Sequence, residues 1–358
     1  MKNFRFIAFA ACALIFSACS SDPDEPEIPD PDPSPEATGL FIVNQGNFQY
    51  GNSSLTFYSP DDDVATQDNF FRANGFKLGD LAQSMTIDPR GNGWIVVNNS
   101  NVIFSIDTST YVETGRVTGI ISPRFIHFVS GTKAYVTALY DNRIAIVDPQ
   151  KHQITGYITI PDMDPSTGST EMMVQVGKYV YVNCWSYNNR IIRIDSDTDR
   201  VDGYVETPIQ PKAMTLDADN NIWAITDGGY YGSPYGYEQP ALVRINTSAL
   251  TVDLTLRMEL GANITSIVTD GTGTQLYWIC NDIYTMPITS SSLPDAPLIS
   301  SNGNWFMGLT VDPVRGDIYI ADALDYVQPG QLLRYSADGN LITTVPTGVI
   351  PGAFCWKK

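Results

Sequence analysis

Residues 134–160 read AYVTALYDNRIAIVDPQKHQITGYITI, and this stretch decides the fold. It holds three short, mostly apolar runs, at 134–138, 144–147 and 154–160, with polar turns between them. Short runs with a period of two, bounded by turn residues, are typical of β-strands. The stretch therefore predicts three consecutive antiparallel strands joined by tight turns.

The same pattern recurs along the chain. Seven aromatic residues, 41 to 54 residues apart, each open a short apolar run: Phe41, Trp94, Tyr135, Tyr181, Trp223, Tyr277 and Tyr319. A strand and a turn precede most of them, as in residues 85–91, and a further strand follows, as in residues 102–107. Four strands in about 40–45 residues are the signature of a propeller blade. The sequence thus predicts an all-β, seven-bladed β-propeller of four-stranded antiparallel blades over residues 39–358.

The two ends of the repeat region predict how the ring closes. The first unit begins at Gly39 with its second strand and lacks an inner strand, whereas residues 351–356 resemble the inner strands that begin at Pro123 and Pro211. We therefore expect the C-terminal strand to complete blade one and remove an open edge. Four aspartates at strand–turn junctions are interpreted as turn formers: Asp88, Asp217, Asp270 and Asp312.

The N-terminal residues have the pattern of an export signal. Lys2 and Arg5 precede an uncharged stretch, 6–18, which is shorter than the roughly 20 residues of a membrane span but fits a secretory signal. The following residues, Phe16-Ser17-Ala18-Cys19, resemble a bacterial lipobox. We predict a lipoprotein signal peptide at 1–18 and a lipidated Cys19. A plain signal peptide with a coincidental cysteine is the alternative.

Residues 19–38 are interpreted as the lipidated cysteine and an acidic, proline-rich tether. Residues 20–38 contain seven acidic residues and six prolines, and such a segment cannot bury enough apolar surface to fold. An acidic run directly after the cysteine resembles the surface-export signal of lipoproteins from gut Bacteroidota. The predicted location is the outer membrane, at the cell surface and facing outward, with lipid as the sole membrane attachment.

Composition argues against several classes of function. The formal charge is -18, and residues 39–358 retain 19 basic and 32 acidic residues, so nucleic acid is not an expected partner. Only two histidines are present, His127 and His152, which argues against a histidine-rich metal site or a Ser-His-Asp triad. Cys184, Cys280 and Cys355 lack metal-type spacing. We predict a protein that is not an enzyme, without a metal site or catalytic cofactor.

Aromatic and amide residues gather in one set of loops. The loops between strands two and three, and those between blades, open onto one face of a propeller and contain eight of the 19 tyrosines. Rigid aromatic rings with interleaved amides suit ligand binding. The predicted ligand-binding residues, over the mouth of the central channel, are Phe48, Tyr50, Tyr140, Arg143, Trp185, Tyr187, Asn188, Tyr230, Tyr231, Tyr235, Tyr237 and Tyr326. Further aromatic residues of these loops are Phe70, Phe71, Phe76 and Trp305.

The repeat is similar to that of a known family. Residues 134–137 (AYVT) and 180–183 (VYVN) resemble the YVTN repeat of YncE-type seven-bladed propellers. With the lipobox and tether, the whole chain resembles the BtuG-type proteins. That resemblance implies a surface lipoprotein that captures cobalamin (vitamin B12) and other corrinoids for a TonB-dependent outer-membrane transporter of the BtuB type. Cobalamin would be a bound ligand, and its apolar corrin and neutral amides suit aromatic rings and Asn side chains.

Other interpretations of the aromatic loops remain open. Rings and amides also bind glycans, so a glycan-binding surface lipoprotein is one alternative, and a propeller scaffold for protein interaction is another. The rings would also serve simply to pack the loops onto the blades. A Ca²⁺ site is a further alternative, since five aspartates recur in these loops: Asp141, Asp227, Asp282, Asp322 and Asp325.

Overall fold

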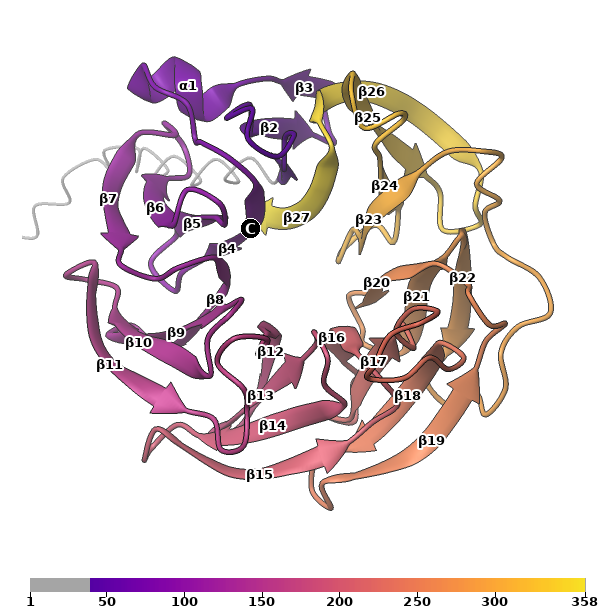
Figure 1. Cartoon of the computed structure of the whole chain (residues 1–358). Coiled ribbons are helices and arrows are strands. Elements are labelled where there is room, and N and C mark those ends of the chain that lie inside the picture. The colour runs from indigo at the N-terminus through magenta and orange to yellow at the C-terminus, as the bar shows by residue number, and fades with distance from the viewer. Residues whose placement is uncertain (1–38, 358) are drawn as a thin grey trace, which may run out of the picture. The chain divides into compact units, whose positions relative to one another are not determined.

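The computed structural model describes residues 39–357 of the 358-residue chain. Its strands form seven antiparallel sheets arranged around a central axis (Figure 1). This arrangement confirms the predicted seven-bladed β-propeller. The predicted signal peptide, Cys19 and tether lie outside the described residues. Within the described part of the chain, no helix has the length and apolar character needed to cross a membrane.

Blades one to four each contain four strands, ordered from the inner strand outward. Blade one consists of β27 (Pro351–Lys357), β1 (Gly39–Asn44), β2 (Ser54–Ser59) and β3 (Val64–Thr66). Blade two consists of β4 (Ala82–Ile87), β5 (Asn92–Val97), β6 (Val102–Asp107) and β7 (Glu113–Thr118). Blade three consists of β8 (Pro123–Ser130), β9 (Lys133–Ala138), β10 (Arg143–Asp148) and β11 (Gln153–Thr159). Blade four consists of β12 (Thr170–Val176), β13 (Tyr179–Cys184), β14 (Arg190–Asp195) and β15 (Arg200–Glu206).

Blades five and seven also contain four strands, whereas blade six contains three. Blade five consists of β16 (Pro211–Leu216), β17 (Ile222–Thr226), β18 (Ala241–Asn246) and β19 (Thr251–Arg257). Blade six consists of β20 (Ile264–Thr269), β21 (Gln275–Cys280) and β22 (Asp282–Pro287). Blade seven consists of β23 (Phe306–Val311), β24 (Ile318–Asp322), β25 (Pro329–Tyr335) and β26 (Leu341–Val349).

The sequence explains why blade six lacks a fourth strand. After β22 the chain returns to that strand at a single bridge, between Ile283 and Ile299. Pro294 and Pro297 lie in the returning segment and have no N–H to donate to a β-ladder. Two such residues within a short segment prevent a regular fourth strand.

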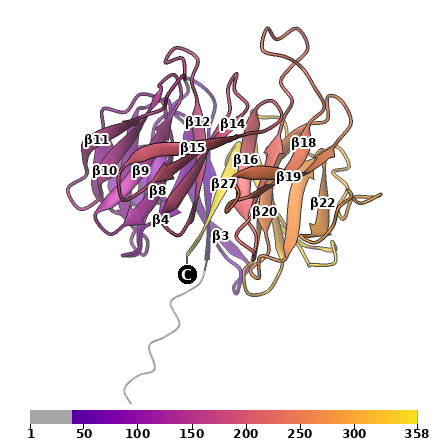
Figure 2. The ribbon, with the colours of Figure 1, turned by 90° about the horizontal axis from the view of Figure 1, so that it is seen from below.

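The C-terminal strand closes the ring as predicted. In blade one, β27 pairs with β1 from Gly39 opposite Lys357 to Asn44 opposite Pro351. Because the two strands are antiparallel, Gly39 and Lys357 lie at one face of the propeller and residues 45–53 at the other. We call the latter the rim face. The marked C-terminus in Figure 2 lies at the face opposite the rim face.

The seven aromatic residues that mark the repeat all lie in the core, with at most 8% of their surface exposed. Turn aspartates hold two of them in place. The indole Nε1 of Trp94 donates to Asp88 Oδ2 at 3.2 Å, and that of Trp223 donates to Asp217 Oδ2 at 3.0 Å. The same carboxylates accept backbone N–H groups of their own turns, which confirms their role as turn formers.

One short helix, α1 (Asn69–Asn74), was not predicted from the sequence. It lies between blades one and two (Figure 1). Its Phe70 is buried, with its ring 5.0 Å from that of Phe104 and 5.3 Å from that of Phe76. Phe70 therefore packs against blade two and does not present its ring to solvent.

Candidate functional site

Each inner strand is irregular at its rim end. In all seven blades the pairing register between the first and second strands shifts near the first residue of the inner strand. Such bulges re-aim side chains and are common beside functional sites. The second residues of the inner strands, which we call the axial ring, are Gln83, Arg124, Glu171, Lys212, Thr265, Met307 and Gly352.

Three members of the axial ring form a buried network across blades two, three and four. Arg124 Nε lies 2.9 Å from both carboxylate oxygens of Glu171, and Arg124 Nη1 donates to Gln83 Oε1 at 2.5 Å. The side chain of Glu171 is 4% exposed and that of Arg124 16%. Burial raises the pKa of Glu171, and the neighbouring Arg124 acts in the opposite direction. The network joins three blades at the axis.

We expect Arg124→Met to destabilise the fold strongly, because it leaves the Glu171 carboxylate buried without its cation. Removing one partner of a buried ion pair typically costs about 3–5 kcal/mol, while replacing both is often far less harmful. Urea unfolding followed by tryptophan fluorescence would measure this, with Arg124→Met/Glu171→Met expected to recover most of the loss. An equal loss in the single and double variants would contradict this account. Arg193→Met, which breaks a partly exposed pair with Asp202, is the control and should cost about 1 kcal/mol or less.

Three tyrosines of blades four and five lie together at the rim face, and Tyr140 of blade three lies near them. The rings of Tyr187 and Tyr235 lie 4.4 Å apart. A hydrogen bond with Tyr230 raises the pKa of Tyr187, and Tyr235 and Tyr140 add smaller effects in the same direction. All four side chains are exposed, by 37% to 65%. We call Tyr140, Tyr187, Tyr230 and Tyr235 the tyrosine cluster; it presents aromatic surface to solvent rather than to the core.

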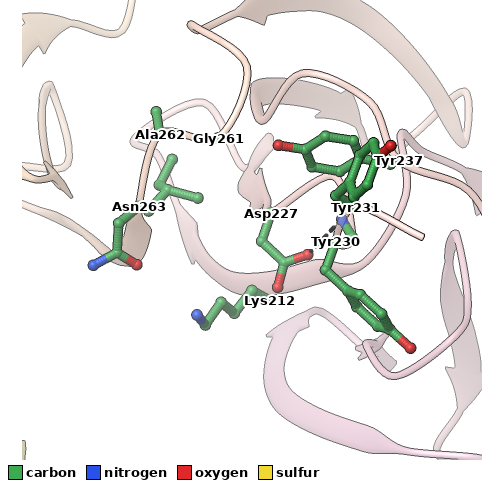
Figure 3. A pocket seen from close by; sticks show the side chains of 10 residues that line it. Lys212, Asp227, Tyr230, Tyr231, Tyr237, Gly261, Ala262 and Asn263 are labelled. Atoms are coloured by element: carbon green, nitrogen blue, oxygen red, sulfur yellow. Dashed lines mark hydrogen bonds between the residues drawn. The ribbon is translucent and has the colours of Figure 1, made fainter. Parts of the chain in front are cut away.

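A hollow of ≈ 320 Å³ lies beside the tyrosine cluster, at the rim ends of blades five and six. Figure 3 shows Lys212 and Asp227 at its centre, with Asn263 on one side and the tyrosines on the other. Tyr231 is 88% exposed, and its ring packs edge-on against Tyr237 at 6.3 Å. The walls of the hollow thus combine aromatic rings, an amide, one cation and one carboxylate.

Trp185 connects blade four to this hollow. Its Nε1 donates to Asp227 Oδ2 at 2.8 Å, and the backbone N–H of Gly229 donates to Asp227 Oδ1 at 3.0 Å. Trp185 is half-buried, so it presents part of its ring while it holds the carboxylate. Replacing Trp185 would therefore disturb Asp227 as well as remove an aromatic surface.

A second aromatic group lies at blades seven and one. The ring of Trp305, which is 53% exposed, packs edge-on against Tyr326 at 5.8 Å. The Tyr326 hydroxyl donates to Met307 Sδ of the axial ring at 3.2 Å. Asn47 Nδ2 donates to the backbone oxygen of Tyr326, which ties the 45–53 loop to blade seven. That loop carries two further exposed rings, Phe48 and Tyr50.

Two predicted site residues have local partners instead. Arg143 forms an ion pair with Asp141 at 3.0 Å, and its guanidinium lies 4.4 Å from the ring centre of Tyr157 on the outer strand β11. Asn188 is half-buried, and its Oδ1 accepts the backbone N–H of Asn189 at 2.9 Å. Arg143 thus engages side chains of its own blade, and Asn188 shapes its own loop.

The loop aspartates accept hydrogen bonds from groups of the rim loops. Asp322 Oδ1 accepts backbone N–H groups of Trp305 and Leu324, and Asp325 Oδ1 accepts those of Val327 and Gln328. Residues 39–357 contain no group of three or more His, Cys, Asp or Glu side chains placed to hold a metal ion.

Both histidines lie in the framework of the propeller rather than in the rim loops. His127, on the inner strand β8, pairs through Nε2 with Gln175 Oε1 at 2.8 Å. Burial lowers its pKa. His152 lies in the β10–β11 turn, on the face opposite the rim face, and stacks on Trp94 at 5.1 Å. Neither imidazole is placed to act on a ligand at the rim face.

Sequence reasoning missed the axial ring and two wall residues of the hollow, Lys212 and Asn263. One signal for the ring was present in the chain. Pro123, Pro211 and Pro351 begin inner strands, and the residue after each proline is a ring member. The alignment of these three strands, used above to predict closure, makes Arg124, Lys212 and Gly352 equivalent positions, but it was not extended to a ring around the axis.

The fold and the rim face define a β-propeller with a polar, aromatic surface at one end of its axis. The chain belongs to a family known by its shared domain, described as a domain of unknown function (DUF5074), whose pattern matches residues 38–347. A search among curated proteins found no match to the sequence.

Solved structures support the fold. A quinonprotein alcohol dehydrogenase-like protein from Bacteroides thetaiotaomicron superposes with a TM-score of 0.67 at 15% identity, covering 90% of this chain and 79% of that one. The periplasmic gluconolactonase of Pseudomonas aeruginosa gives 0.66 at 11% identity, covering 90% and 99%. Virginiamycin B lyase from Staphylococcus aureus gives 0.58 at 17%, covering 74% and 84%. At such identities these similarities concern architecture alone.

Proposed function

We propose that this protein captures cobalamin or a related corrinoid on the rim face and passes it to a TonB-dependent outer-membrane transporter of the BtuB type. The observation that carries the proposal is the tyrosine cluster beside the hollow. Rings from three blades are exposed to solvent, although burying such surface is favourable. Exposed aromatic surface held in place by neighbouring rings is what a large, partly apolar ligand needs.

The size of the hollow agrees with a ligand that extends beyond it. Its volume of ≈ 320 Å³ lies at the lower end of the range of sites for drug-sized molecules. Cobalamin is larger, so only part of it would enter the hollow, and its corrin would lie over the tyrosine cluster. The amide of Asn263 and the tyrosine hydroxyls offer partners for the neutral amides around the corrin.

The place where the chain joins the propeller suits display at a cell surface. Gly39 lies at the face opposite the rim face. The chain therefore enters the propeller at the face opposite the rim face. We propose that Cys19 is lipidated and that the propeller faces outward from the outer membrane.

The direct test of ligand binding uses the chain without residues 1–19. We expect cyanocobalamin to stay with the protein through gel filtration, so that the corrin absorbance elutes in the protein peak. Absorbance that elutes wholly with free ligand at micromolar protein would refute corrinoid capture. Bovine serum albumin at the same concentration controls for nonspecific retention.

The anchor makes a separate prediction. Cys19→Ala should release the protein from the membrane fraction, because the lipid is its proposed attachment. External protease should degrade the wild-type propeller on intact cells. Undiminished membrane association of Cys19→Ala would refute the anchor, whereas protection from external protease would refute only the outward orientation.

A glycan-binding function is the second candidate, and Trp305 favours it. Its indole is 53% exposed and supported edge-on by Tyr326, which is the form of a stacking platform for a sugar ring. Retention on a glycan column, lost on Trp305→Ala and combined with no cobalamin binding, would establish this alternative.

A further inference from the structure

We propose that Lys212 binds an anionic group of the ligand, and that for cobalamin this group is the phosphodiester of its nucleotide tail. The inference rests on the corrinoid function proposed above and specifies which part of the ligand enters the hollow. Cobalamin carries one phosphodiester between its corrin and its benzimidazole base. The tail would occupy the hollow, and the corrin would lie over the tyrosine cluster.

The ion-pair pattern of the axial ring singles out Lys212. The ring contains two cations, and Arg124 is committed to Glu171. Among the described residues no carboxylate oxygen lies within 4.0 Å of the Lys212 ammonium, although Lys212 is near enough to Glu171 to lower the pKa of that carboxyl slightly. Lys212 thus keeps its charge available to a ligand.

Most other half-buried lysines and arginines on the inner and third strands form ion pairs. Besides Lys212, six lysines and arginines are half-buried on inner or third strands; four of them form ion pairs, namely Arg124, Arg193, Arg244 and Arg334, and the other two are Arg190 and Lys357. Arg190 still has partners, because it donates to Asn188 Oδ1 at 3.3 Å and lies over the Tyr204 ring. Lys357 lies at the opposite face. Lys212 is therefore the half-buried cation of the rim face that is best placed to receive an anion.

The carboxylates around the hollow leave room for an anion. Both oxygens of Asp227 accept hydrogen bonds, from Trp185 Nε1 and from the Gly229 N–H, and Glu171 is paired with Arg124. The chain as a whole is strongly acidic, so a single anionic group is retained only where a cation faces it. In Figure 3 the Lys212 ammonium points toward the side of the hollow where Asn263 lies, away from Tyr230.

The aromatic walls suit the rest of the nucleotide tail. Tyr231 and Tyr237 line the same hollow as Lys212, and their edge-on arrangement leaves ring surface exposed. A planar base stacks on such rings, and an ammonium binds a phosphate oxygen as a point charge. A hollow of ≈ 320 Å³ with these walls is better matched to a base and phosphate than to the wider corrin.

The test compares two corrinoids that differ in the tail. Cyanocobalamin carries the phosphodiester and base, whereas dicyanocobinamide lacks both. For Lys212→Gln in the chain without residues 1–19, we expect cyanocobalamin affinity to fall about tenfold at low salt, the scale of a hydrogen bond to a charged group. The loss should shrink as salt rises, because salt screens the pair. Dicyanocobinamide affinity should stay unchanged.

Matched variants separate charge from packing. Lys212→Arg keeps the cation and should retain most of the cyanocobalamin affinity. Lys178→Gln removes a lysine in the β12–β13 turn of the opposite face and should change neither affinity. Equal losses for both corrinoids, or no loss for either, would overturn the role of Lys212 while leaving corrinoid capture intact. Failure of the wild-type protein to bind either corrinoid would instead refute the proposed function, and this inference with it.

Discussion

Removing residues 351–358 is expected to leave little soluble, folded protein. The deletion takes away β27, the inner strand of blade one, and exposes the backbone edge of β1, whose six residues are all buried. It also removes Phe354 and Trp356, which are half-buried and pack against the core cluster of blades one and seven. Losing a large core side chain costs about 3–5 kcal/mol, and a domain has only about 5–15 kcal/mol in total. The soluble fraction and the thermal melting curve would measure the effect.

A shorter deletion provides the control. Removing residues 357 and 358 keeps the pairing of β27 with β1 from Leu40 opposite Trp356 to Asn44 opposite Pro351. This variant should remain soluble and melt within a few degrees of the full chain. If the longer deletion melted like the full chain, the closing strand would not be needed for the integrity of the ring.

The blade pattern could be predicted because each blade repeats a local rule. Aromatic anchors, alternating strands and turn aspartates lie within about 45 residues of one another, so the four strands of one blade, as in residues 123–159, can be recognised within a single unit. The buried Trp94 and its bond to Asp88 show the rule at work. Closure was predictable for the same reason. The first unit lacks its inner strand, and the C-terminal residues 351–356 have the pattern of an inner strand, so the two belong together.

Departures from the repeat were harder to predict. The three-stranded blade six depends on prolines at 294 and 297, and helix α1 is a six-residue helix between blades. In both places a few residues override the pattern of a whole unit. The repeat pattern reflects many positions at once, so it does not reveal the effect of a few residues in one unit.

The site was predictable as a face but not residue by residue. Aromatic content alone does not distinguish Phe70, which is buried on Phe104, from Tyr231, which is 88% exposed. It also does not show that Arg143 pairs with its neighbour Asp141. Lys212 can be recognised as a candidate binding residue only when its contacts with neighbouring blades are known. Those contacts join residues far apart in sequence, and a pattern along the chain cannot supply them.

The largest effect on ligand binding is expected from replacing both Tyr230 and Tyr231 by alanine. Both side chains line the hollow, and Tyr230 also contacts Tyr187 of the tyrosine cluster. An aromatic anchor at a binding hot spot contributes about 2 kcal/mol or more, so cyanocobalamin affinity should fall about thirtyfold or further. Equilibrium titration monitored by corrin absorbance or by tryptophan fluorescence would measure it. Trp185→Ala should also weaken binding, but it releases Asp227 and is harder to interpret.

The control for this experiment is another exposed tyrosine. Tyr204 lies on the outer strand β15 and is 51% exposed, the same fraction as Tyr230. Tyr204→Ala should leave the affinity unchanged, and His152→Ala on the opposite face should do the same. Because Tyr230 and Tyr231 are exposed, their loss should change the free energy of unfolding by only about 0.5 kcal/mol each. A double variant that melts normally and still binds cyanocobalamin like the wild type would show that the tyrosines do not form the binding surface, and a glycan site at Trp305 would then be the function to test.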